Sequence, residues 1–343
     1  MGVKITDLIE PKALEFQDLH NKTIAVDAFN VLYQFITTIR QPDGSPLTDD
    51  NGKVTSHLVG LFYRLTNLLK RDIRMVFVFD GESHSLKHEE QKRRNEAKAE
   101  AKEKYEKAVE EEDIEGMKKY ASRTSRLTSE MIEESKNLLS AMGIPWIQAP
   151  GEGEAQCARI VSNGDAFAVM SQDADALLFG SPRIVKNLSI SQRRKQGGRL
   201  SYDKVRPELI VRDEILERLH LTQEKLIILG ILVGTDFNPG GIKGIGPKKA
   251  LKIVQEKEGD WEDMFSELGW YDLFEHSWKE VYDIFKESDV KDDYDIAFKE
   301  FEPDKVMKIL VDDHGFSRER ISSVCDELVK TTDNSQKGLG DFM

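Results

Sequence analysis

The sequence predicts an α/β protein built around a parallel sheet. Four short segments have strand character, and helical patterns separate them along the chain. Three of the four are nearly continuous apolar runs, which is typical of strands buried on both faces of a parallel sheet. With 343 residues and 39% hydrophobic content, the chain can also bury a sizeable core.

The predicted strands cover residues 22–29, 73–81, 144–152 and 165–175. Each one ends at a turn or loop where acidic side chains lie. In open α/β sheets, ligands and chemistry gather at the carboxyl ends of the strands. We therefore expect the functional site at that edge of the sheet.

The segment from Leu86 to about Tyr120 predicts helical structure. It is rich in Ala, Glu, Lys and Arg and contains no proline, so its helix propensity is strong. Its apolar residues are too sparse for a coiled-coil seam. Most such runs are solvated helices with ion pairs between residues i and i+4. Because this run begins just after Asp80, an element that overhangs an active site is the alternative.

A second helical region predicts contact with phosphate. Residues 224–236 form an apolar stretch without alternation, which indicates a buried helix. The glycine-rich turn at 241–250 follows, with Pro247 near a helix start and Lys248 and Lys249 beside it. Backbone N–H groups at such a turn, together with lysines, bind phosphate without reading bases.

The charge of the chain is unevenly distributed. The net charge is −13, but residues 256–313 alone carry 20 acidic and 7 basic side chains, so the rest is nearly neutral. The overall acidity therefore does not exclude a nucleic-acid partner. Frequent aromatic residues in the acidic region indicate folded helices and not a disordered tail.

The composition argues against a disulfide-rich, membrane-spanning or secreted protein. Cys157 and Cys325 are far apart in the sequence, which fits a reducing compartment without a disulfide framework. No segment approaches the roughly 20 apolar residues of a membrane span, and the N-terminus lacks the apolar core of a secretory signal. We expect a soluble protein with no membrane partner.

Seven acidic residues stand at the ends of the predicted elements: Asp27, Asp80, Glu152, Glu154, Asp173, Asp175 and Asp236. Any one of them could simply cap the helix that follows. In a parallel sheet, however, they converge on one edge, where clustered carboxylates repel one another unless cations are bound. The sequence therefore predicts a divalent-cation site.

The ligand chemistry narrows the choice of cation. All seven candidates are oxygen donors, and no histidine lies in a zinc-binding motif. This favours Mg²⁺ or Mn²⁺. In two-metal phosphoryl chemistry, ions about 3.5–4 Å apart activate the attacking water and stabilise the leaving oxygen. We expect Gly151 and Gly153 to let the backbone turn tightly beside the two glutamates.

Seven segments carry a more specific signal: VDAFNVLYQF (26–35), TSHLVGLFYR (55–64), VFVFDG (76–81), GIPWIQAPGEGEAQCA (143–158), SQDADALLFG (171–180), LVGTDFNPG (232–240) and GIKGIGPKKA (241–250). In this order and spacing they resemble the flap endonucleases of the structure-specific 5′ nuclease (XPG-like) superfamily, over nearly the whole chain. The resemblance implies a PIN-like, mostly parallel sheet between helical layers and a helical arch above the metal site. It also implies a K⁺-assisted helix-hairpin-helix-type region at 224–254 that grips duplex DNA.

The resemblance also implies roles for individual residues. The seven acids would hold two Mg²⁺ ions, with Mn²⁺ as a substitute, and Lys87 and Arg94 at the base of the arch would act on the scissile phosphate. Tyr33 would stack on an unpaired base, with a place in the core as the alternative. The implied DNA contacts are Gly2, Tyr33, Arg40, Lys87, Arg94, Gly244, Gly246, Lys248 and Lys249.

The C-terminal stretch QKGLGDFM (336–343) resembles the motif that binds the sliding clamp (PCNA). Gln336, Leu339 and Phe342 match the pattern, and Met343 stands where a second aromatic is usual. Methionine can fill an adaptable pocket. The missing basic extension makes an archaeal type the expectation.

The predicted function is a 5′ flap endonuclease with 5′-3′ exonuclease activity, acting on branched DNA in replication (Okazaki fragment maturation) and repair. A PIN-like metal-dependent ribonuclease and a non-catalytic, clamp-tethered DNA-junction binder are the alternatives. We expect a monomer in the cytoplasm, associated with the nucleoid, or in the nucleus if eukaryotic. The expected regions are the N-terminal nuclease region with the start of the arch (1–98), the rest of the arch (99–125), the internal nuclease region (126–255), the acidic helical region (256–330) and a flexible tail (331–343).

Overall fold

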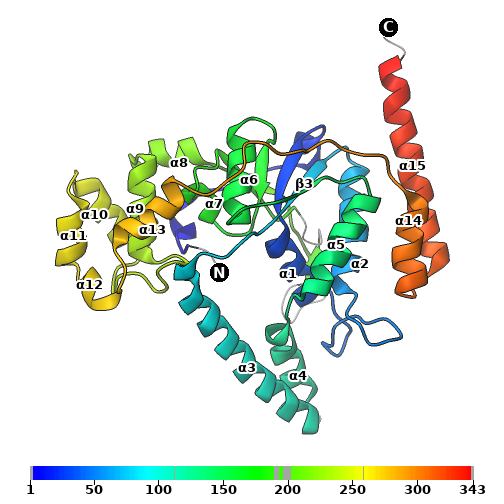
Figure 1. Ribbon diagram of the computed structural model, residues 1–343, viewed down its shortest axis with the longest axis horizontal. Helices are drawn as coiled ribbons and strands as arrows, with labels where there is room; N and C mark the ends of the chain where they lie inside the picture. Colours follow the sequence, from blue (N-terminus) through cyan, green and yellow to red (C-terminus); the bar gives the residue numbers. More distant parts are fainter. Residues whose placement is uncertain (1–2, 112, 189–192, 196–201, 258, 341–343) are drawn as a thin grey trace.

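A computed structural model describes residues 3–111, 113–188, 193–195, 202–257 and 259–340 (Figure 1). Its centre is a seven-stranded sheet with the order β1-β9-β6-β5-β2-β3-β4. The strands are β1 (Lys12–Ala13), β2 (Thr23–Asp27), β3 (Arg74–Phe79), β4 (Trp146–Gln148), β5 (Ala168–Met170), β6 (Arg183–Lys186) and β9 (Glu208–Val211). A separate antiparallel pair joins β7 (Arg193–Lys195) to β8 (Tyr202–Lys204).

The four predicted strands are confirmed, and they are neighbours in the sheet as β5-β2-β3-β4, all parallel. β6 continues the parallel part, whereas β9 pairs antiparallel with β6 on one side and with β1, the edge strand, on the other. The predicted fold class, a mostly parallel sheet between helices, is therefore confirmed. The three strands at that edge were not predicted, because they are short and begin with charged residues.

Both faces of the sheet are buried. In β3, Val76 and Val78 belong to one core cluster, whereas Met75, Phe77 and Phe79 belong to the other. This two-sided burial explains the continuous apolar run in the sequence. One face packs against α1 (Ala28–Thr38), α2 (Ser56–Leu69), α5 (Ser129–Ala141), α14 (Pro303–Met307) and α15 (Arg318–Gly340). The other packs against α6 (Gly153–Ser162), α7 (Asp175–Leu178), α8 (Arg212–Leu219), α9 (Gln223–Val233) and α10 (Pro247–Glu256).

Two helices project from this body as an arch, α3 (His88–Glu110) and α4 (Ile114–Ala121). In Figure 1, α3 leads away from the sheet and α4 returns beside it. Most described side chains of α3 are exposed, as the solvated reading of this segment predicts. The first turn of α3 nevertheless lies at the carboxyl edge of the sheet, so the overhang was also a correct expectation.

The acidic region is folded, as predicted. Its helices are α11 (Trp261–Glu267), α12 (Trp270–Leu273) and α13 (Trp278–Lys286), and Phe265 stacks on Trp278 with ring centroids 4.9 Å apart. From α13, residues 287–302 run without regular structure across the molecule to α14, as the orange trace of Figure 1 shows. A π-helical segment (Lys308–Asp313) then leads to α15. In the described part of the chain, no helix has the length and apolarity of a membrane span.

Candidate active site

The seven predicted acids lie at one edge of the sheet. Asp27 ends β2, Asp80 follows β3, Glu152 and Glu154 begin α6 after β4, and Asp173 and Asp175 follow β5. Because these strands are parallel neighbours, their carboxyl ends share an edge. Asp236, after α9, joins the set, since its charge acts on Asp175 and on Lys87. The predicted convergence is therefore present.

Burial and mutual repulsion make these carboxylates hard to ionise together. Burial, with the charge of Asp80, raises the pKa of Asp27 to about 7. Burial, with the charge of Glu152, raises the pKa of Asp80 to about 6. Burial and neighbouring carboxylates raise the pKa of Asp175 to about 7 and that of Glu154 well above its ordinary value. At neutral pH the ionised carboxylates at this edge repel one another, and a bound cation would reduce that repulsion.

Several of these acids are also held by the backbone. The side chain of Asp27 caps α1 by accepting a hydrogen bond from the N–H of Asn30 (3.1 Å), so the capping alternative is correct for this residue. The N–H of Val3 donates to Asp175 (2.5 Å). A cap and a cation ligand are compatible, because each carboxylate has two oxygens.

Gly153 has a different role from the predicted one. Neither Gly151 nor Gly153 adopts a positive φ, so neither is needed for a tight left-handed turn. Instead the N–H of Gly153 donates to Oδ1 of Asp80 (2.7 Å), and a Cβ on Gly153 would lie 2.6 Å from that oxygen. Glycine is required here because a carboxylate approaches the start of α6 closely.

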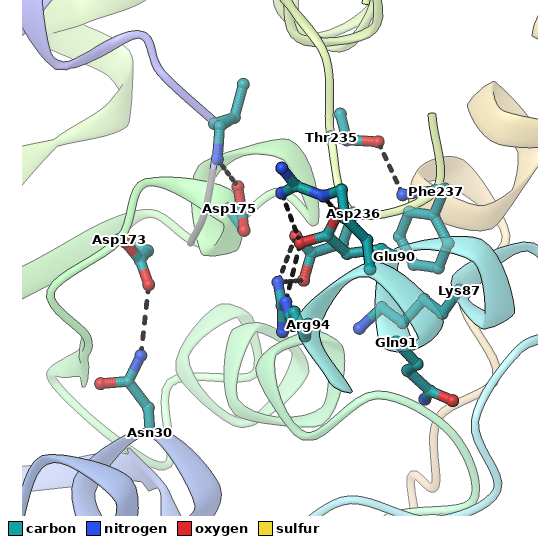
Figure 2. A network of polar contacts seen from close by, with 12 residues as sticks. Asn30, Lys87, Glu90, Gln91, Arg94, Asp173, Asp175, Thr235, Asp236 and Phe237 are labelled. Atoms are coloured by element: carbon teal, nitrogen blue, oxygen red, sulfur yellow. Dashed lines mark hydrogen bonds and ion pairs between the residues drawn. The ribbon is translucent and has the colours of Figure 1, made fainter. Parts of the chain in front are cut away.

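Two cations at the foot of the arch face the acids. Nζ of Lys87 pairs with Glu152, and Nη2 of Arg94 lies 2.8 and 2.7 Å from the two oxygens of Asp236. Figure 2 shows Arg94 and Lys87 directed toward this edge. The resemblance to the flap endonucleases had implied both residues at the base of the arch, beside the metal site. Lys87 and Arg94 thus neutralise part of the negative charge of the carboxylates.

Glu90 is a residue that the sequence analysis missed. It is only 3% exposed, and its carboxylate accepts hydrogen bonds from Nε of Arg94 (2.8 Å) and Nε of Arg93 (2.7 Å). Its signal in the sequence was the i,i+4 spacing to Arg94. That spacing recurs along the whole arch, at Glu100 and Lys104 for example, so it did not single out this pair.

A cavity of about 280 Å³ opens between the arch and the acids. Its walls include the acids Asp80, Glu152 and Asp236 and the two cations that face them. The remaining lining residues are Phe29, Gly81, Glu82, Ser83, Glu90, Gln91 and Gly151. Acidic and basic side chains thus line one space that a phosphate group and small cations could share.

The donor set fits divalent cations. In the described residues, no group of three or more acidic, histidine or cysteine side chains is arranged to hold a metal ion in this structure, and Lys87 and Arg94 contact two of the acids directly. All seven acids are oxygen donors, which suits a small hard cation. Burial and neighbouring carboxylates oppose the ionisation of Asp27 and Asp175 and raise their pKa values, an effect that a bound cation would offset.

Hydrogen bonds hold the loop that carries Asp236. Thr235 Oγ1 donates to Oδ1 of Asn238 (2.7 Å) and accepts from the N–H of Phe237 (3.1 Å), and Asn238 Nδ2 donates to the carbonyl of Ile231 (2.7 Å). Asn238 is fully buried. These bonds tie the loop to the end of α9 and so fix the position of Asp236.

The predicted phosphate-binding turn is exposed. Gly244 has φ +80°, and Gly246 caps α10, where Pro247 is the first helical residue as predicted. Lys248 and Lys249 are exposed in the first turn of α10. Backbone and lysines are therefore available to a phosphate from outside.

Tyr33 and Arg40 contact the end of the arch. Tyr33 is half-buried on α1; its hydroxyl donates to the carbonyl of Ser125 (2.8 Å), and Nζ of Lys98 lies 4.9 Å from the centre of its ring. Arg40 donates to the carbonyls of Thr37 and Gly44 and to the hydroxyl of Ser125. Both side chains therefore hold the arch to α1 in this structure.

The structure covers only part of the predicted clamp motif. Gln336 and Leu339 lie in α15, whose backbone is helical as far as Gly340. Phe342 and Met343, like Gly2 at the other terminus, lie outside the described residues.

The sequence of the chain matches two described protein families and is similar to several known proteins over nearly its whole length. The family described as XPG N-terminal domain matches residues 1–101, and that described as XPG I-region matches residues 143–236. Flap endonuclease 1 of Aeropyrum pernix is 48% identical over 341 residues, covering 98% of this chain and 97% of that protein. Flap endonuclease 1 of Pyrococcus furiosus is 47% identical, covering 96% and 95%.

Solved structures agree with this placement. Flap endonuclease-1 from Methanococcus jannaschii superimposes with a TM-score of 0.76 at 41% identity, covering 97% of this chain and 100% of that one. The catalytic core of Rad2 in complex with DNA substrate gives a TM-score of 0.64 at 25% identity, covering 94% and 96%.

Proposed function

Since the chain belongs to the XPG family, and within it to the flap endonucleases, we propose that it hydrolyses phosphodiester bonds in branched DNA that bears a 5′ flap. It is a divalent-metal-dependent nuclease. The observation that carries this function is the meeting of seven carboxylates at one sheet edge, where Lys87 and Arg94 contact two of them and line the same cavity. Its roles in replication, including Okazaki fragment maturation, and in repair follow from this substrate.

We propose two Mg²⁺ ions at this edge, with Mn²⁺ able to substitute. When bound, they supply an activated water and stabilise the leaving oxygen. Asp27, Asp80, Glu152, Glu154, Asp173, Asp175 and Asp236 would hold them. The raised pKa values of the buried acids support this assignment, because a bound cation favours the ionised carboxylates and so offsets the burial and repulsion that raise these values.

Lys87 and Arg94 are proposed to bind the scissile phosphate. Glu152 and Asp236 would serve as cation ligands, and the ammonium of Lys87 and the guanidinium of Arg94 would then contact the non-bridging oxygens of the scissile phosphate in place of these acids. Fixed positive charge at that point stabilises the transition state more than the substrate.

Binding of the rest of the DNA is assigned to the surrounding surface. The turn at Gly244 and Gly246, with Lys248 and Lys249, holds the duplex backbone, and K⁺ is proposed as an aid at this turn. Tyr33 and Arg40 are proposed near the cleavage point, where they would exchange their contacts with Ser125 for nucleic acid. Gly2 is proposed beside the DNA.

Further proposals concern the cell. The motif at Gln336, Leu339, Phe342 and Met343 would bind the sliding clamp (PCNA), and the protein would act as a monomer in the cytoplasm at the nucleoid. A pull-down of the purified clamp by the full chain and by a chain ending at residue 335 tests the motif. Equal capture by both chains would rule it out.

The test of the function compares substrates and ions. Matched 5′-flap substrates of DNA and of RNA are incubated with Mg²⁺ or with EDTA. Cleavage of the DNA flap with Mg²⁺ and none with EDTA is expected. Preference for RNA would favour the PIN-like ribonuclease, and binding without turnover would favour the non-catalytic junction binder.

A further inference from the structure

Glu90 is unusual for a residue of the arch. Among the described side chains of α3 it is the buried charged one, at 3% exposure, whereas its neighbours Glu89 and Gln91 are exposed. A buried carboxylate is costly unless it is paired and hydrogen-bonded. The fold must therefore supply partners for Glu90, and these partners suggest its role.

Both partners are arginines on the same helix. Arg93 donates from Nε (2.7 Å) and Nη2 (2.9 Å), and Arg94 donates from Nε (2.8 Å). Burial opposes ionisation of Glu90, but the hydrogen bonds from Arg93 and Arg94 outweigh it, so the pKa lies below its ordinary value. Glu90 is therefore an anion that the two guanidinium groups share.

The two arginines differ in what else they contact. The side chain of Arg93 is 59% exposed. Arg94 is 39% exposed, and its Nη2 lies on Asp236 (Figure 2). A guanidinium is planar and rigid, so a bond at Nε fixes the direction of its far edge. Glu90 thus fixes the Nε edge of Arg94 while the other edge faces the acids.

We propose that Glu90 is a positioning residue for Arg94, which keeps the guanidinium aimed at the cavity when Arg94 exchanges Asp236 for the substrate phosphate. This inference rests on the proposed function, in which Arg94 contacts that phosphate. Without Glu90, the flexible side chain of Arg94 samples other rotamers, and fewer molecules hold the reactive arrangement. Small displacements of this kind can cost about a hundredfold in rate.

The test is a double-mutant cycle on single-turnover cleavage of 5′-flap DNA at saturating enzyme. Glu90→Ala should slow cleavage by about ten- to a hundredfold, with the Kd for the flap changed by less than about threefold. Glu90→Gln keeps an acceptor for Nε, so it should recover part of the rate. Arg93→Ala is the matched control, because it removes the other partner of Glu90, and it should cleave like the wild type.

The decisive variant is Glu90→Ala combined with Arg94→Ala. If Glu90 acts through Arg94, the double variant cleaves as fast as Arg94→Ala alone. If Glu90→Ala slows the Arg94→Ala enzyme by the same factor as the wild type, the proposal is overturned. Thermal unfolding of each variant separates this result from loss of the fold. If the wild type cleaves but the effects of Glu90→Ala and Arg94→Ala are additive, only this inference is wrong. If the wild type shows no Mg²⁺-dependent cleavage, the proposed function and the inference are both wrong.

Discussion

The backbone N–H of Gly153 donates a hydrogen bond of 2.7 Å to the carboxylate of Asp80. This contact joins the end of β3 to the first turn of α6, and so it sets the distance between Asp80 and the pair Glu152 and Glu154. The positive end of a helix also favours an anion at this position. Two carboxyl-bearing elements are thereby fixed relative to each other by a residue that carries no side chain.

We expect Gly153→Ala to weaken cation binding, because the new Cβ would lie 2.6 Å from Oδ1 of Asp80 and push the carboxylate away. Displaced supporting contacts typically reduce metal affinity by about 10–100-fold. Titration of Mn²⁺ followed by calorimetry measures this. The control is Gly151→Ala, whose Cβ would meet its nearest neighbour at an ordinary 3.6 Å. Equal affinities for the two variants would contradict the account.

Lys87→Met should lower the single-turnover rate by about 10²–10³-fold, since it removes a fixed positive charge from the transition state. The Kd for flap DNA should change little. Lys12→Met is the comparison, because Lys12 pairs with Glu214 on the exposed surface away from the acids. If both variants cleave at the same rate, Lys87 has no part in the chemistry.

Lys248→Ala and Lys249→Ala should weaken DNA binding without changing the rate at saturation. Each should reduce the slope of log K against log salt by about 1, because one phosphate contact is lost. Glu267→Lys, on the exposed face of α11 in the acidic region, should leave the slope unchanged, because we expect that face to lie away from the DNA. A changed slope for Glu267→Lys would place that face beside phosphate.

A buried cluster of titratable groups predicts a pH dependence of stability. Glu134 lies 3.0 Å from His57 and 3.4 Å from His314, and His314 also lies 3.2 Å from Asp49. Hydrogen bonds from His314 and His57 outweigh the effect of burial and lower the pKa of Glu134 from 4.5 to about 2. The hydrogen bond to Glu134 raises the pKa of His314 above its ordinary 6.5.

The directions of these two pKa shifts define a pH range in which the cluster stabilises the fold most. The contribution of Glu134 is complete above about pH 4.5 and is lost as the pH falls toward 2. The contribution of His314 is complete below about pH 6.5 and is lost as the pH rises through its raised pKa. The difference in Tm between the wild type and His314→Gln should therefore be largest between these values. A difference that does not vary with pH would contradict the assignment.

Much of this site could be predicted from the sequence because of two-sided burial. β2, β3 and β5 are apolar runs that stand out, and each ends at an acid, so the convergence of Asp27, Asp80 and Asp173 follows from a parallel sheet alone. The outer strands β1 and β9 lack this signal, since short strands with charged ends resemble loops.

The role of Glu90 could not be predicted in the same way. Glu90 is one of many glutamates in a charged helix, and only the tertiary structure shows that it is buried beside Asp236. The requirement at Gly153 was likewise hidden, because a close approach by Asp80 leaves no trace in the sequence near α6. Local sequence patterns predict which residues are buried or cap a helix, whereas contacts between segments that are distant in the sequence depend on the fold.

The most direct test of the central claim is single-turnover cleavage of a 5′-flap DNA by the wild type and by Asp173→Ala in Mg²⁺, with the Kd for the same flap measured in parallel. Asp173 follows β5 among the seven acids, and its carboxylate accepts a hydrogen bond from Asn30 (3.4 Å). The account predicts that cleavage falls by at least about a thousandfold while the Kd stays within about threefold. Cleavage by Asp173→Ala at a rate close to that of the wild type would contradict it.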